Sequence, residues 1–72
     1  MNSKSLGEKI KLRRKSLGLT QSELAGNKIT RNMLSRIENG AALPSLDTLE
    51  HIAIGLKLPV PYLLSEDDDL PF

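Results

Sequence analysis

Residues 20–40 of this 72-residue chain read TQSELAGNKITRNMLSRIENG, and this stretch decides the fold. Thr20 and Glu23 stand three positions apart, which is the spacing of a capping box at the start of a helix. Gly26-Asn27 ends the apolar segment that this cap opens, as glycine commonly does at a helix C-terminus. The pattern predicts a helix of barely two turns between the threonine and the glycine.

A second capped segment follows within the same stretch. Thr30 is its N-cap candidate, Arg31 to Glu38 is the predicted helix, and Asn39-Gly40 ends it. Leu34 and Ile37 form an apolar edge because residues three apart share one side of a helix. The polar residues of this helix are therefore expected on its outward surface.

Upstream, residues 5–17 carry apolar side chains at helical spacing beside a group of basic ones. Ser5 and Glu8 also have capping-box spacing, which marks the expected start of this helix. Gly18 follows the last apolar residue, where a left-handed cap favours a residue without Cβ. We therefore predict a first helix from Ser5 to Leu17.

Downstream, Ser45 is the predicted N-cap of a fourth helix with an apolar stripe. Pro59 and Pro61 lead into a final helical turn, Val60 to Leu64, because proline is tolerated in a first turn. The five segments predict an all-α compact bundle. Its expected core is Leu6, Ile10, Leu17, Leu24, Ala25, Ile29, Leu34, Ile37, Leu46, Leu49, Ile52, Ala53, Leu56, Leu58, Val60 and Leu63.

Composition excludes several classes of protein. The chain has no cysteine and a single histidine, His51, so a disulfide framework and a Cys/His zinc site are both excluded. Two aromatic residues argue against a β-sandwich or barrel. No apolar run reaches the ~18 residues of a membrane span. We expect a soluble cytoplasmic protein with no membrane partner and no metal or other cofactor. Because no catalytic arrangement is evident, we also expect no enzyme and no small-molecule ligand.

The outward edge of the 31–38 segment carries side chains that suit DNA bases. Arginine pairs with guanine O6 and N7, and asparagine pairs with adenine N6 and N7, each through two hydrogen bonds. The expected base-contacting residues are Thr30, Arg31, Asn32, Ser35 and Arg36. Met33 suits either a thymine methyl group or the core. Two capped helices with such an edge form a helix-turn-helix.

Three blocks, in this order, resemble the signature of the phage-repressor-like (XRE, Cro/cI-type) helix-turn-helix family. They are LTQSELA at 19–25, SRIENG at 35–40 and PSLDTL at 44–49. The resemblance implies a lambda-repressor-like fold of five helices. It also implies a sequence-specific, DNA-binding transcriptional regulator, which we expect to be a repressor. Such a protein would bind a palindromic operator in double-stranded DNA as a homodimer and read the major groove with its third helix.

The resemblance further implies roles for side chains outside that edge. Gln21 and Asn39 resemble residues that contact the DNA backbone, and we expect further backbone contacts from Thr20, Lys9 and Lys28. Arg14 and Glu38 match a family pair that forms an ion bridge between the first and third helices. The dimer surface is expected at the last helix and the C-terminal end. Its expected members are Val60, Tyr62, Leu64 and Phe72.

The turn between the two short helices departs from the family pattern. Only three residues separate Ala25 from Ile29, one fewer than in the commonest turn, and no glycine occupies the usual place. Asparagine tolerates a positive φ. We therefore expect Asn27 to supply the left-handed residue of this turn.

Net charge is +1, but it is distributed unevenly. Residues 1–64, the predicted DNA-binding domain, contain all ten Lys and Arg residues against five acids, whereas residues 65–72 contain the other four acids. We therefore predict a basic domain with an acidic tail. A rival interpretation is a protein-interaction or antitoxin-like module that uses the same fold to bind a protein partner. Retention on random duplex DNA that falls steeply with salt distinguishes the two.

Overall fold

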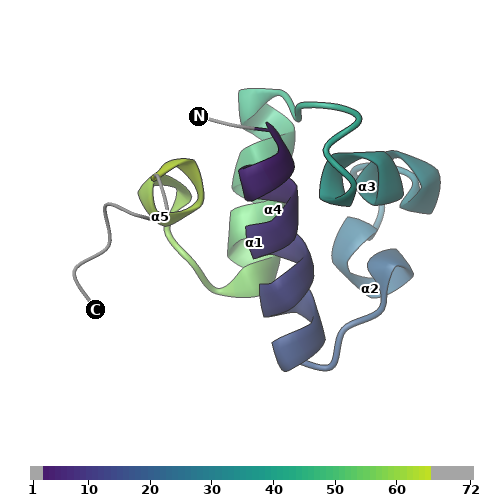
Figure 1. The fold of residues 1–72 in the computed structure, drawn as a ribbon. Helices are drawn as coiled ribbons and strands as arrows, with labels where there is room; N and C mark the ends of the chain where they lie inside the picture. Colours follow the sequence, from purple (N-terminus) through teal and green to yellow (C-terminus); the bar gives the residue numbers. More distant parts are fainter. Residues whose placement is uncertain (1–2, 66–72) are drawn as a thin grey trace.

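The structure is a computed structural model that describes residues 3–65, with side chains from residue 5 onward. The described chain forms five helices: α1 (Ser3–Ser16), α2 (Gln21–Ala25), α3 (Arg31–Glu38), α4 (Leu46–Leu56) and α5 (Val60–Leu64). In Figure 1, α1 and α4 occupy the middle of the molecule, with α2 and α3 on one side and α5 on the other. The predicted all-α bundle is confirmed.

Three helices begin at the caps that the sequence predicts. The amide of Glu23 donates to Thr20 Oγ1 over 3.0 Å, and the amide of Thr20 donates to Glu23 Oε1 over 2.8 Å, which completes the capping box of α2. The amide of Met33 donates to the Thr30 hydroxyl over 3.0 Å at the start of α3. Ser45 caps α4 in the same way. Local hydrogen bonding therefore defines where these helices start.

The first helix differs from the prediction at both ends. It begins at Ser3, so Ser5 lies inside the helix and the predicted capping box with Glu8 is wrong. A serine followed by a glutamate three positions later also fits a helix interior, and residues 3 and 4 are already helical here. The helix ends at Ser16, and Gly18 has a φ of 73°, as expected for a left-handed cap.

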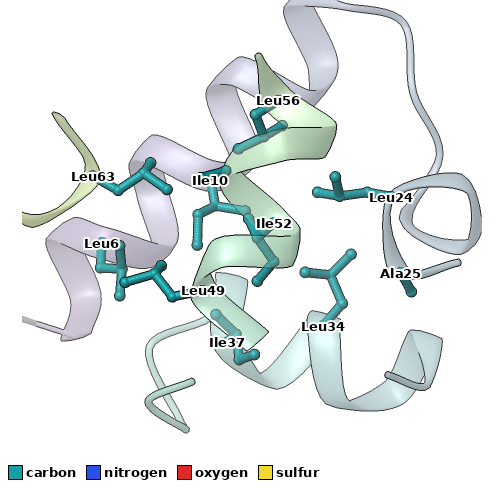
Figure 2. Packing of buried hydrophobic residues seen from close by; sticks show 11 residues of the cluster. Leu6, Ile10, Leu24, Ala25, Leu34, Ile37, Leu49, Ile52, Leu56 and Leu63 are labelled. Atoms are coloured by element: carbon teal, nitrogen blue, oxygen red, sulfur yellow. The ribbon is translucent and has the colours of Figure 1, made fainter. Parts of the chain in front are cut away.

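The core collects side chains from all five helices (Figure 2). Eleven of the sixteen predicted core residues are buried, and Leu17, Ile29, Leu58 and Val60 pack against them half-buried. The exception is Leu46, which is 65% exposed. It is the first residue of α4, and the buried stripe begins one turn later at Leu49. The prediction for Leu46 is therefore wrong. Ala42, which we did not predict, packs against the core.

A glycine sets the spacing between α1 and α3. A Cβ atom at Gly7 would stand 2.4 Å from the carbonyl oxygen of Ile37 and 2.6 Å from that of Glu38. Both are backbone atoms, so a larger side chain would require the helix to move. The last turn of α3 is therefore held against α1 at a distance that only glycine permits.

Among the described helices, none is long and apolar enough to cross a membrane.

Candidate nucleic-acid interface

The α2–α3 turn is built on Gly26 rather than on Asn27. Gly26 follows the last residue of α2 with φ 57° and ψ −135°, a combination open essentially to glycine. Within residues 3–65, Lys57 is the one non-glycine residue with a positive φ. The prediction for Asn27 is therefore wrong. The chain reverses at the first position after the helix, and the turn bond runs from the Lys28 amide to Ala25 O over 3.2 Å.

The polar edge of α3 faces outward. Its spacing puts positions 31, 32, 35 and 36 on one side of the helix, opposite the buried Leu34 and Ile37. Thr30, Arg31, Asn32 and Arg36 are exposed, and Ser35 is half-buried. Met33 is 39% exposed and so does not belong to the core. The predicted base-contacting residues therefore share one accessible surface, which we call the α3 face.

A buried ion pair holds the end of α3. Arg14 Nε lies 2.6 Å from Glu38 Oε2, and Arg14 Nη2 donates to Glu38 Oε1 over 3.0 Å, so the contact is bidentate. Arg14 Nη1 donates to Leu19 O over 2.8 Å. The hydrogen bonds that Arg14 donates to Glu38, together with the negative charge of that carboxylate, raise the pKa of Arg14 above its ordinary value, although burial opposes the shift. The ion bridge expected from the family resemblance is present.

The same carboxylate reaches the start of α2. Gln21 Nε2 donates to Glu38 Oε1 over 3.1 Å. Gln21 directly follows the cap Thr20, and Glu38 directly precedes Asn39, the exposed C-cap of α3. Three of the predicted backbone-contacting residues, Thr20, Gln21 and Asn39, therefore lie near one another. The contact between Gln21 and Glu38 joins segments 17 residues apart, so local sequence patterns do not predict it.

Lys9 does not lie at this surface. Its side chain is buried, and its ammonium donates to the backbone oxygens of Tyr62 and Ser65 and to Ser65 Oγ. It also stands 5.5 Å from the centre of the Tyr62 ring. The carbonyls at the end of α5 attract a cation because they have no partners inside that helix. Lys9 therefore joins α1 to the end of α5, and its prediction as a DNA contact is wrong.

Lys28 lies exposed in the turn before α3. Its ammonium forms an ion pair with the Asp47 carboxylate in the first turn of α4, and both side chains are open to solvent. Exposed ion pairs of this kind contribute little to stability and exchange readily for other partners. The position is therefore compatible with a contact to a phosphate group.

The predicted dimer residues lie on a different part of the molecule, at α5. Tyr62 and Leu64 are exposed, and Val60 is half-buried against the core. Phe72 and the acidic residues 66–69 lie outside the described residues.

Among the residues that the structure describes, no group of three or more potential ligands could hold a metal ion.

Two short capped helices with a tight turn and an exposed polar second helix define a helix-turn-helix protein. Comparison with known proteins agrees: the helix-turn-helix family model matches residues 10–63. The chain is 44% identical over 64 residues to the ImmF control region 10 kDa protein of Bacillus phage phi105, which covers 88% of this chain and 71% of that protein. The chain thus belongs to the phage-repressor-like helix-turn-helix family of DNA-binding transcription regulators.

Two solved structures share the fold. Bacillus thuringiensis PlcR, in complex with the peptide PapR7 and DNA, superposes with a TM-score of 0.84 at 37% identity. That match covers 92% of this chain, which spans only 25% of the PlcR chain. The clp gene regulator ClgR from C. glutamicum has a TM-score of 0.79 at 26% identity, covering 89% of this chain and 84% of ClgR. The PlcR structure thus contains DNA, and ClgR is described as a gene regulator.

Proposed function

We propose that the chain is a transcriptional repressor that binds double-stranded DNA as a homodimer and reads the major groove with α3. The observation that carries the proposal is the α3 face. It is exposed and polar, while the opposite edge of the same helix is buried in the core. An α-helix fits the major groove, and Arg31, Asn32 and Arg36 have the donors that distinguish guanine and adenine there.

Contacts to the DNA backbone would set the register of α3 in the groove. Gln21 and Asn39, close together through Glu38, flank the α3 face with Thr20. Lys28 stands in the turn before α3. Such contacts orient a protein on the duplex without reading sequence, whereas the base edges supply the specificity.

A second copy would pair through α5. Tyr62 and Leu64 expose apolar surface there, and Val60 is only half-buried. A two-fold dimer presents two α3 faces to two half-sites one helical turn apart, about 34–36 Å from centre to centre. This geometry favours a palindromic operator.

Two relatives support the regulatory role. PlcR, 37% identical, was solved with DNA. The relative from phage phi105 is described as a control-region protein, which favours control of transcription by a small repressor.

Selection of bound duplexes from a random-sequence pool tests the proposal. The expected product is a palindrome whose half-sites are one helical turn apart, and expression from a promoter that contains it should fall when the protein is present. If no sequence is enriched and duplex DNA is not retained even at low salt, DNA binding is refuted and a role in binding a protein partner is favoured. If expression rises, the repressor assignment is wrong.

A further inference from the structure

His51 joins α4 to the C-terminal end of α2. Its Nε2 lies 3.0 Å from Leu24 O and 3.0 Å from Ala25 O. Both partners are carbonyl oxygens and can only accept, so Nε2 carries the hydrogen. The last carbonyls of a helix have no partner inside it, and α2 has only five residues. A side chain from another helix therefore completes the end of the first helix of the helix-turn-helix.

This contact lies where the chain departs from the commonest family turn. Ala25 O accepts from His51 and from the Lys28 amide, the backbone bond that closes the shortened turn. A Cβ at Gly26 would stand 3.6 Å from His51 Cε1, which is ordinary van der Waals contact. The imidazole thus bonds to the carbonyl groups that precede Gly26 and also lies beside Gly26 itself.

The α2–α3 turn is stabilised by contacts with other parts of the molecule. Glycine has the greatest backbone freedom of all residues, and Gly26, Asn27 and Lys28 are all exposed. By contrast, the helix that carries His51 is anchored in the core through Leu49, Ile52, Ala53 and Leu56. His51 is therefore a link from this anchored helix to the turn, in addition to the exposed ion pair of Lys28 with Asp47 and the half-buried Ile29 that follows the turn.

We propose that His51 is a positioning residue for the helix-turn-helix. By donating its Nε2 hydrogen to the last two carbonyls of α2, it holds the shortened turn in the one conformation that sets the direction of α3. An effect of His51 on DNA binding rests on the proposed function. An effect of His51 on the orientation of α3 does not depend on it.

Three variants of the full chain test the proposal. His51→Leu keeps a similar volume but removes the donor, and His51→Gln restores an N–H donor near the Nε2 position. Ile10→Val is the matched control, because it loosens the core in α1 without touching the turn. All are compared under conditions in which each is fully folded.

The first measurement needs no DNA. Backbone amide resonances of residues 26–38 should shift in His51→Leu, with the changes continuing into α3, and should return toward the wild-type positions in His51→Gln. A purely structural role would lower stability and leave the α3 resonances in place, as Ile10→Val should. Unchanged α3 resonances in His51→Leu would overturn the proposal.

The second measurement uses the duplex that the wild-type protein selects. His51→Leu should bind it about two- to tenfold more weakly, the equilibrium equivalent of one net hydrogen bond, and His51→Gln should recover most of the loss. A loss in His51→Leu no larger than that in Ile10→Val would overturn the positioning role in recognition. If the wild type itself selects no duplex, the proposed function fails instead, and the amide resonances alone decide the role of His51.

Discussion

Replacing Glu38 with alanine should destabilise the protein more than any other single change to a charged side chain described above. Glu38 is buried and accepts hydrogen bonds from Arg14 Nε at 2.6 Å, Arg14 Nη2 at 3.0 Å and Gln21 Nε2 at 3.1 Å. The alanine variant leaves the guanidinium of Arg14 buried without its counter-charge. Breaking a buried pair in this way costs about 3–5 kcal/mol. That is a large share of the roughly 4–11 kcal/mol expected for a chain of this length.

Urea unfolding of the wild type, of Glu38→Ala and of a double variant measures this loss of stability. Glu38→Ala should lower the free energy of unfolding by that amount. The double variant Arg14→Met with Glu38→Leu should recover most of it, because replacing both charges by apolar groups removes the desolvation cost together with the attraction. A loss below about 1 kcal/mol in Glu38→Ala would place the pair among weak surface contacts and refute the reasoning.

The charge on Arg14 persists over the whole pH range of such an experiment. Because the pKa of Arg14 is raised in the folded protein, the stability that this shift contributes is fully present below the ordinary pKa of arginine. It is lost only as the pH rises through the raised value. The cost of Glu38→Ala should therefore not disappear through deprotonation of Arg14 at any pH near neutrality.

Four further changes have defined outcomes. Gly7→Ala should cost about 1–3 kcal/mol in urea unfolding, because its Cβ would meet Ile37 O; an unchanged midpoint would show that α3 moves freely. Lys9→Met should speed amide exchange in α5 and leave the salt dependence of DNA binding unchanged; a slope smaller by about one would mean that Lys9 does contact a phosphate. Arg36→Ala should weaken operator binding by about 1–3 kcal/mol and relax specificity at one base position, and uniform weakening over all sequences would exclude a base contact. Deleting residues 66–72, which contain four acids, should raise affinity for random DNA, because their negative charge repels DNA phosphates; unchanged affinity would exclude a role for the acidic tail in limiting non-specific binding.

Helix positions were predictable wherever the signal is local. Thr20, Thr30 and Ser45 cap their helices through bonds to amides three residues later, so the sequence alone contains both partners. The errors arose where one pattern fits two structures. Ser5 with Glu8 has the spacing of a cap but lies inside a helix, and Leu46 continues an apolar stripe but precedes its buried part.

Apart from the Arg14–Glu38 bridge, which the family resemblance implied, the candidate site was predictable only for residues whose direction follows from helical spacing. The α3 face is of this kind, because Leu34 and Ile37 fix which side of the helix is buried. Lys9 and His51 find their partners 53 and 27 residues away along the chain, and those partners are mainly backbone oxygens. A carbonyl group carries no sequence signal, so contacts of this type become visible only when the helices are placed in space.

The most direct test of DNA recognition by α3 is a titration of the isotopically labelled protein with the selected duplex, followed by its amide and side-chain resonances. The largest changes are predicted at positions 30–36 and at the start of α2, with α4 little affected. Changes confined to α4 and α5, with the α3 face unaltered, would contradict recognition through α3.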